Sequence, residues 1–215
     1  KDGALWFKST DFVEEKDNVL VRANGIPTYF AADVAYHRNK IETRGFDKVI
    51  DIWGADHYGH VARMKNALYA LGIDKNKLDV IIMQLVRLMQ DGEIVRMSKR
   101  TGKAVTLNDL LEDTSIDAAR FFFNMRQADS HMVFDLDLAV EQSSDNPVYY
   151  VQYAHARMCS ILNLIKQDGY DVQNYDSLDV SQLNAPQEIE LLKKLSQLPE
   201  EIKAAALAYE PSRIT

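Results

Sequence analysis

Hydrophobic positions in the first 45 residues change from the period of strands to that of helices. Val19 and Val21 alternate with other positions, and Asn24-Gly25 then forms the dipeptide typical of a type I′ hairpin turn. From Thr28 the pattern is helical, and it closes with basic residues, which the helix dipole favours at that end. This part of the chain predicts short strands and turns followed by a helix.

A strand, a helix and a second strand are predicted next, with short links. The β-branched run at 47–54 ends in glycine, and the run at 78–88 has the character of a second buried strand. Between them, apolar residues three or four apart define one helix face: Val61, Met64, Leu68 and Leu71. This order predicts a βαβ unit with parallel strands.

Helices dominate the predicted remainder. Thr106 and Asp109 have the spacing of a capping box. A helix over 115–126 would turn inward Ile116, Ala119, Phe122 and Phe123. A long helix should start at Asn146-Pro147 and carry an apolar stripe with steps of three and four residues, formed by Val151, Ala154, Met158, Ile161 and Ile165. Two more helices are expected, separated at Pro199.

The kind of element predicted changes near residue 136. Residues 1–136 combine strands and helices, whereas residues 137–215 carry helix signals without strand signals. The expected fold class is therefore α/β, with a parallel-sheet domain at 1–136 followed by an all-α domain at 137–215.

Composition is that of an ordinary globular protein with a sizeable core. The 215 residues are 47% hydrophobic and 27% charged. We expect a cytoplasmic protein, because no apolar run approaches the roughly 20 residues of a membrane span and no leader pattern is present. The single cysteine, Cys159, cannot form an internal disulfide and is expected in the core.

A basic loop stands out in a chain of net charge −7. Arg96, Lys99, Arg100 and Lys103 fall within eight positions that also include Ser98. Cations, a hydroxyl and a following helix N-terminus suit phosphate binding. A solvated hairpin connection would have the same composition, so both interpretations stay open at this point.

Four polar or glycine positions follow the first strand of the βαβ unit, where ligands of open α/β sheets bind. Gly54 would let a ligand approach the backbone, and Asp56 could accept hydrogen bonds from a ribose diol. Asp56 could instead only cap the helix. His57 and His60 could share a metal, although no third ligand has suitable spacing.

Tyr29 and Asp33 are four residues apart on one predicted helix face. A carboxylate beside a phenol hydroxyl suits a guanidinium group, whose planar fork forms bidentate ion pairs. The alternative is a surface aspartate near a partly buried tyrosine. Since the sequence contains no nucleophile-plus-base constellation, it points to binding and electrostatic stabilisation more than to covalent catalysis.

Five blocks in order give the chain a resemblance to the arginyl-tRNA synthetase family, which belongs to the class I synthetases. The blocks are YFAADVAYHRNK, GADHYGHVARMKNAL, RMSKRTGKAVTLNDLL, DAARFFF and SSDNPVYYVQYAHARMCSIL. The resemblance covers residues 1–168, with weaker support beyond. It implies the second half of a Rossmann-like nucleotide-binding domain at 1–136 and the start of an α-helical anticodon-binding domain at 137–215.

The resemblance also implies roles for particular residues. Residues 96–100 match the KMSKS signature, whose loop closes over ATP, with Arg96 and Arg100 replacing its first lysine and last serine. Ser98 and Lys99 would be the catalytic residues. The implied ATP-binding residues are Gly54, Asp56, His60, Val95, Met97 and Arg100. The implied arginine-binding residues are Tyr29, Asp33 and His57.

The implied activity is ligation of arginine to its tRNA, with ATP and the Mg²⁺ that accompanies ATP. The resemblance further implies that the full-length enzyme is a monomer, does not bind a membrane, and has no metal ion held by its own side chains. The HIGH signature of class I synthetases is absent from this sequence. We therefore expect a fragment that is inactive alone, because adenylate formation needs groups from both halves of the fold.

Two other functions stay open. One is a class I synthetase for a different amino acid, and the other is a non-catalytic helical fragment that binds tRNA. Residues 137–215 contain six Lys and Arg against twelve Asp and Glu. Such an acidic segment disfavours the second alternative, because a nucleic-acid surface should be basic.

Overall fold

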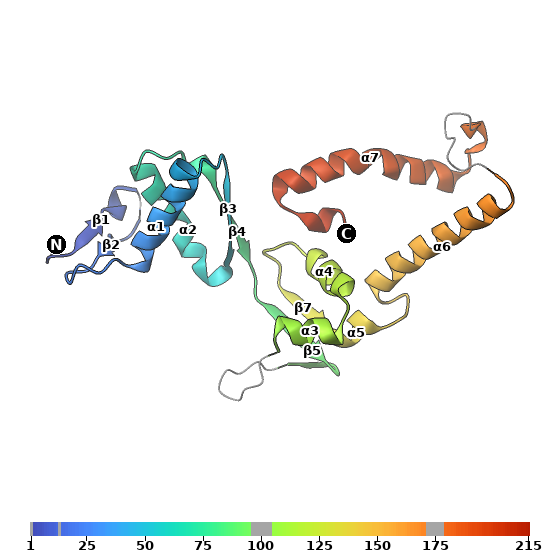
Figure 1. Cartoon of the computed structure of the whole chain (residues 1–215), viewed down its shortest axis with the longest axis horizontal. Coiled ribbons are helices and arrows are strands. Elements are labelled where there is room, and N and C mark those ends of the chain that lie inside the picture. Colours follow the sequence, from blue (N-terminus) through green and yellow to red (C-terminus); the bar gives the residue numbers. More distant parts are fainter. Residues whose placement is uncertain (1, 13, 96–104, 171–178) are drawn as a thin grey trace. The chain divides into compact units, whose positions relative to one another are not determined.

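The computed structural model describes residues 2–12, 14–95, 105–170 and 179–215 (Figure 1). In these ranges the chain is mixed α/β, with parallel strand pairs and a helical C-terminal region. Its contacts divide it into two compact units. The first comprises Lys1–Leu85 with Ala128–Ser130, and the second comprises Val86–Gln127 with His131–Thr215.

The first unit opens with an antiparallel pair of strands, β1 (Leu5–Phe7) and β2 (Asn18–Val21). In the turn after β2, the Gly25 N–H donates to the Arg22 carbonyl at 2.9 Å. Gly25 has a φ of 78°, but Asn24 does not share a positive φ. The predicted type I′ turn is therefore wrong, because that turn needs positive φ at both central residues.

The predicted first helix is confirmed as α1 (Tyr29–Arg38), which continues into a π-helical turn at Asn39–Thr43. Thr28 caps it, since its side-chain oxygen accepts from the Ala31 N–H at 3.3 Å. The same hydroxyl donates to the Val19 carbonyl at 2.8 Å, which ties the start of α1 to β2.

The predicted βαβ unit is confirmed. Strand β3 (Val49–Gly54) leads through a short 3-10 turn into α2 (Tyr58–Ala70), and β4 (Leu78–Met83) pairs with β3 in parallel. On the predicted apolar face of α2, Met64 and Leu68 are fully buried, although Leu71 is exposed. The core of this unit comprises Phe30, Ile41, Val49, Met64, Ala67, Leu68, Ile73 and Leu78.

The single strand predicted over 78–88 is wrong. It is two strands, β4 and β5 (Val86–Gln90), which belong to different sheets. Between them the Gln84 N–H donates to the Ala128 carbonyl at 2.8 Å. The apolar run continues through the break, so hydrophobicity alone does not mark it.

The second unit has a three-stranded sheet. Strand β5 pairs antiparallel with β6 (Glu93–Ile94) and parallel with β7 (Met132–Asp135). Helices α3 (Leu107–Asp113), α4 (Ile116–Asn124) and α5 (Leu136–Val140) belong to the same unit. Its core comprises Leu88, Leu110, Ala118, Ala119, Phe122, Phe134, Leu136, Ala139 and Val148.

The predicted start of α3 is confirmed in the second unit, but the predicted inward face of α4 is only partly correct. The capping box of Thr106 and Asp109 is present at the start of α3. Ala119 and Phe122 of α4 are buried as expected. Ile116, in the first turn of α4, is 62% exposed, and Phe123 is 38% exposed, so their predicted inward positions are wrong. The Phe123 ring nevertheless lies 5.1 Å from the ring of the buried Phe134.

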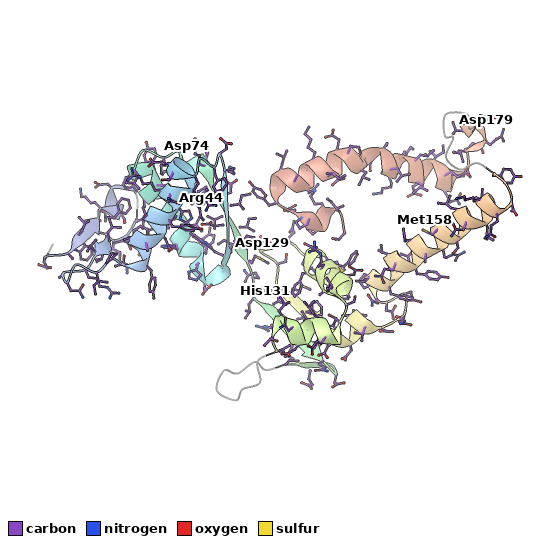
Figure 2. The ribbon with its side chains drawn as sticks, in the orientation of Figure 1. Arg44, Asp74, Asp129, His131, Met158 and Asp179 are labelled. Atoms are coloured by element: carbon purple, nitrogen blue, oxygen red, sulfur yellow. The ribbon has the colours of Figure 1, made fainter. Side chains whose placement is uncertain are left out.

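Two long helices complete the described chain, α6 (Pro147–Gln167) and α7 (Pro186–Ala208). The predicted split at Pro199 is wrong, because α7 runs through that proline; losing one backbone hydrogen bond does not end a helix of this length. The expected core position of Cys159 is also wrong. Cys159 is exposed. Met158, beside it on α6, is exposed as well (Figure 2).

None of the helices in the described ranges is long and apolar enough to cross a membrane. After β7 every described element is a helix, which matches the predicted change of element type. The domain boundary at residue 136 itself stays a prediction.

Candidate functional site

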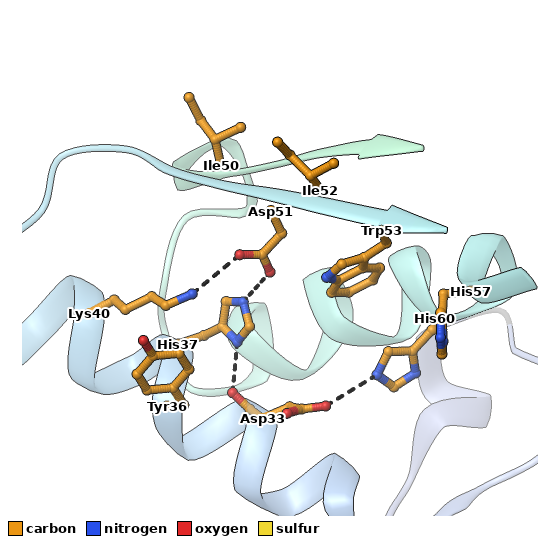
Figure 3. Close-up of a pocket in the computed structure, with 10 residues that line it drawn as sticks. All are labelled: Asp33, Tyr36, His37, Lys40, Ile50, Asp51, Ile52, Trp53, His57 and His60. Carbon is orange, nitrogen blue, oxygen red and sulfur yellow. Dashed lines mark hydrogen bonds and ion pairs between the residues drawn. The ribbon is translucent and has the colours of Figure 1, made fainter. Parts of the chain in front are cut away.

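A cleft of about 530 Å³ in the first unit brings together residues from α1, β3 and the region around the start of α2 (Figure 3). It contains three of the predicted site residues, Asp33, His57 and His60. The remaining lining residues are Tyr36, His37, Lys40, Ile50, Asp51, Ile52 and Trp53.

The alternation of β3 explains which of its side chains reach α1. Asp51 and Trp53 point to the same face as the buried Val49, whereas Ile50 and Ile52 are exposed on the other face. Figure 3 shows Asp51 and Trp53 directed toward α1 and the α2 side. A charged residue is thereby placed on the inner face of an otherwise apolar strand.

Asp33 and His60 face each other across the cleft. Asp33 Oδ2 lies 4.0 Å from His60 Nε2, and the Asp33 side chain is 53% exposed. The imidazole lies beside two aromatic rings, with centroids 5.6 Å from Phe30 and 5.5 Å from Trp53. Burial lowers the pKa of His60 below its usual 6.5, and the charge of Arg63 lowers it further. A neutral imidazole leaves the Asp33 charge without a strong cationic partner in the cleft.

Gly54 and Asp56 lie where β3 ends. A Cβ placed on Gly54 would be 2.7 Å from Asp56 Oδ1, so the absence of a side chain allows this carboxylate to fold back over the strand end. The Asp56 side chain is 81% exposed, and its Oδ2 lies 3.7 Å from His57 Nε2. Asp56 therefore presents a solvated carboxylate at the carboxyl end of a parallel strand, the position expected for a ligand contact.

Tyr29 lies one turn before Asp33 on α1, but it is 90% exposed and does not line the cleft. Val95 belongs to the second unit, where its N–H donates to the Leu88 carbonyl at 2.9 Å. The remaining predicted site residues lie outside the described residues: Met97, Ser98, Lys99 and Arg100.

Sequence reasoning missed a charged group at the other end of the cleft. Asp51 accepts from His37 Nε2 at 2.5 Å and from Lys40 Nζ at 3.2 Å. All three side chains are largely buried. The position of Asp51 could have indicated this group from the sequence, because a charged residue within a buried β-branched run needs hydrogen-bond or ion-pair partners.

The described cleft is suited to binding a cation and an adjacent polar group. Asp33 supplies a half-exposed carboxylate, and Trp53 and Tyr36 supply aromatic walls. A planar cationic ligand matches these features, because carboxylates form bidentate ion pairs with guanidinium groups and aromatic faces stack on them. In the described part of the chain, no group of three or more His, Cys, Asp or Glu side chains is arranged to hold a metal ion.

The chain is similar to known proteins over its whole length and matches one family model in its C-terminal part. Residues 151–215 match the family described as the DALR anticodon binding domain. Over all 215 residues, the chain is 62% identical to the arginine–tRNA ligase of Acetivibrio thermocellus and 60% identical to that of Caldanaerobacter subterraneus subsp. tengcongensis. The chain spans 38% of the length of each of these relatives.

Solved structures show the same similarity. A structure from Campylobacter jejuni, described as that of an arginyl-tRNA synthetase, superposes with a TM-score of 0.87 at 36% identity. The match covers 100% of this chain and 46% of that one. The arginyl-tRNA synthetase of Thermus thermophilus gives a TM-score of 0.77 at 20% identity, over 98% of this chain and 43% of its own, and so supports the fold.

Proposed function

Since the whole chain is similar to arginine–tRNA ligases, we propose that it is part of such an enzyme, which joins arginine to its tRNA at the expense of ATP. The single observation that supports this most strongly is the identity of 62% over every residue of the chain. The cleft supports it independently, because a carboxylate without a strong cationic partner is available there for a guanidinium group.

The reaction has two steps, and this chain contributes binding groups to the first. The carboxylate of arginine attacks the α-phosphorus of ATP, a P–O bond forms, and pyrophosphate leaves. A hydroxyl of the terminal tRNA ribose then attacks the activated carbonyl, loses its proton, and releases AMP. Neither step needs a protein nucleophile, so positioning and charge stabilisation are the roles left for the protein.

Each candidate residue then has a role in the proposal. Asp33 binds the guanidinium group, with Tyr29 on the preceding turn and His57 at the cleft. Gly54 and Asp56 hold the ATP ribose, and His60 contributes to the same nucleotide site. Ser98 and Lys99 stabilise the phosphates, assisted by Val95, Met97 and Arg100.

Mg²⁺ would enter this reaction as the ATP complex. Among the residues that the structure describes, no group of three or more His, Cys, Asp or Glu side chains is arranged to hold this ion. When bound, Mg²⁺ neutralises phosphate charge.

The tRNA would contact the region that matches the DALR anticodon binding domain. We also propose a class I mechanism, a cytoplasmic location and a full-length enzyme that is a monomer.

Amino-acid selection by the full-length enzyme tests the proposal. The purified enzyme should charge tRNA with arginine and ATP, and should show no charging when arginine is replaced by each of the other standard amino acids. Charging with a different amino acid would favour a synthetase of the same class with another specificity. Absence of charging with all of them would overturn the enzymatic function.

The chain by itself is proposed to be inactive. Purified 215-residue protein should give negligible arginylation, whereas turnover like that of the full-length enzyme would contradict this. A salt titration of tRNA binding addresses the helical-fragment alternative. Tight binding by residues 137–215 alone, lost steeply with salt, would favour that alternative over the synthetase.

A further inference from the structure

The buried end of the cleft contains a hydrogen-bonded chain that the proposed reaction does not use. His37 is 4% exposed, and its Nε2 lies 2.5 Å from Asp51 Oδ2 (Figure 3). Lys40 Nζ holds the other carboxylate oxygen of Asp51 at 3.2 Å. Removing polar and charged groups from water opposes folding, so buried interactions of this kind are a weak source of stability. Their hydrogen bonds can instead fix the geometry of the groups that they join.

The second ring nitrogen of His37 connects this pair to the candidate recognition carboxylate. His37 Nδ1 lies 2.7 Å from the backbone carbonyl oxygen of Asp33, one turn earlier on α1. Both partners of His37 are acceptors, so it makes both bonds when both ring nitrogens carry hydrogen. The imidazole thus joins the backbone of α1 at Asp33 to a side chain of β3.

The Asp33 carboxylate depends on its backbone for its position. Its contact with His60 is long, at 4.0 Å, and half of the side chain is exposed. By contrast, the carbonyl of the same residue is held by a short bond to a buried ring. Strand β3, to which that ring is bonded, ends at Gly54, beside Asp56.

We propose that His37 is a positioning residue for the Asp33 carboxylate, because its two hydrogen bonds hold the Asp33 turn of α1 at a fixed place against β3. This inference rests on the proposed function, in which Asp33 binds the guanidinium group of arginine. The Asp51–His37 pair sets the separation between the guanidinium-binding carboxylate and the ribose-binding end of β3. Lys40 supports the pair by fixing Asp51.

Three variants of the full-length enzyme test the inference. His37→Asn keeps a donor near the Asp33 carbonyl and loses the bond to Asp51. His37→Gln keeps a donor near Asp51 and loses the bond to the carbonyl. Lys40→Gln leaves His37 unchanged and loosens Asp51. The matched control is Arg38→Ala, which removes the exposed ion pair of Arg38 with Glu42 on the same helix.

The readout is the KM for arginine beside the KM for ATP in tRNA charging. Both His37 variants should raise the KM for arginine roughly tenfold, since small misplacements of a binding group are costly, and should leave the KM for ATP within about twofold. Lys40→Gln should act in the same direction with a smaller effect. Arg38→Ala should leave both constants within about twofold.

Other outcomes separate failure of this inference from failure of the proposed function. Asp33→Asn is measured in the same assay. If Asp33→Asn raises the KM for arginine while the folded His37 variants do not, the positioning role is overturned and the proposed function stands. If Asp33→Asn has no effect on the KM for arginine, Asp33 does not bind arginine, and the positioning role proposed for His37 is overturned as well. An equal rise of both KM values in the His37 variants indicates general disruption and also overturns the role. Thermal melts establish which variants are folded. If the His37 variants do not fold, the KM for arginine of Lys40→Gln tests the positioning role in their place.

Discussion

Asp33 on α1 and His60 on α2 face each other at 4.0 Å, and the pKa of His60 is lowered from its usual value. A carboxylate usually raises the pKa of a neighbouring imidazole. Here burial beside Phe30 and Trp53, together with the charge of Arg63, outweighs that attraction. The cleft therefore keeps the negative charge of Asp33 available for a ligand.

The lowered pKa of His60 makes stability depend on pH in a defined window. Between that lowered value and 6.5, the unfolded chain binds a proton that the folded chain does not, so stability falls as the pH drops through the window. Above pH 6.5, His60 is neutral in both the folded and the unfolded chain, so it does not lower the free energy of unfolding there. His60→Gln should reduce the loss of stability between about pH 7.5 and about pH 5.5.

Urea unfolding of the wild type and His60→Gln at the two pH values measures this difference. His131→Gln, at an exposed histidine of the second unit, controls for the loss of one histidine. Equal acid sensitivity of the wild type and His60→Gln would contradict the assignment of the shift to burial of His60.

Gly54→Ala should weaken ATP binding without unfolding the protein. The new Cβ would lie 2.7 Å from Asp56 Oδ1, and the exposed Asp56 side chain can swing away, which removes the carboxylate from the strand end. The KM for ATP should rise about fivefold, equivalent to one ordinary hydrogen bond. The KM for arginine should change little.

Gly59→Ala is the matched control for this prediction. A Cβ on Gly59 meets nothing within 4 Å, and the residue lies within α2, where alanine is the better helix former. It should leave both KM values unchanged. If Gly54→Ala behaves like Gly59→Ala in the charging assay, Asp56 does not hold the ribose.

Lys99→Ala should lower the charging rate at saturating arginine and ATP. Lys99 lies outside the described residues, and this prediction comes from its place in the KMSKS-like stretch. Removing one group that stabilises transition-state charge costs on the order of a hundredfold in kcat. Lys103→Ala, beyond the matched stretch 96–100, should retain most of the rate. Similar losses in the two variants would argue for a general basic patch.

Asn146 should be the most costly cap to remove in the second unit. Its side chain accepts from the Val148 N–H at 3.0 Å and donates to the Glu141 carbonyl at 2.8 Å, and the residue is buried. Asn146→Ala should lower the free energy of unfolding by about 2 kcal/mol, through loss of the cap and of the bonds to the Glu141 and Ala139 carbonyls.

Denaturant unfolding of the full-length enzyme measures the Asn146→Ala effect. Ser143→Ala, which removes a single bond of 3.2 Å to the Asp145 N–H on the same loop, should cost less than about 0.5 kcal/mol. Equal effects of the two substitutions would show that the buried bonds of Asn146 contribute little.

Local patterns in the sequence predicted much of the fold, because they depend on residues close in the chain. The Thr106–Asp109 capping box, the βαβ unit and the start of α6 at Asn146 all follow from such patterns. The break between β4 and β5 does not, since a continuous apolar run hides it. The exposure of the α6 stripe also depends on which surfaces pack together, which periodicity does not specify.

The candidate site was predictable residue by residue but not as an arrangement. Asp33 and His60 were both named from the sequence, whereas their juxtaposition depends on the packing of α1 beside α2. The bond between His37 and Asp51 joins positions 14 residues apart on different elements, so spacing could not reveal it. A charged residue inside the β3 run was the only advance sign.

The KM for arginine of the full-length Asp33→Asn enzyme tests the central claim most directly. The amide keeps the shape of the carboxylate and removes its charge, so a guanidinium group would lose its ion pair. The KM for arginine should rise on the order of a hundredfold, with the KM for ATP nearly unchanged, and discrimination against citrulline, the neutral analogue of arginine, should be largely lost. An unchanged KM for arginine with discrimination intact would contradict the assignment of this cleft to arginine.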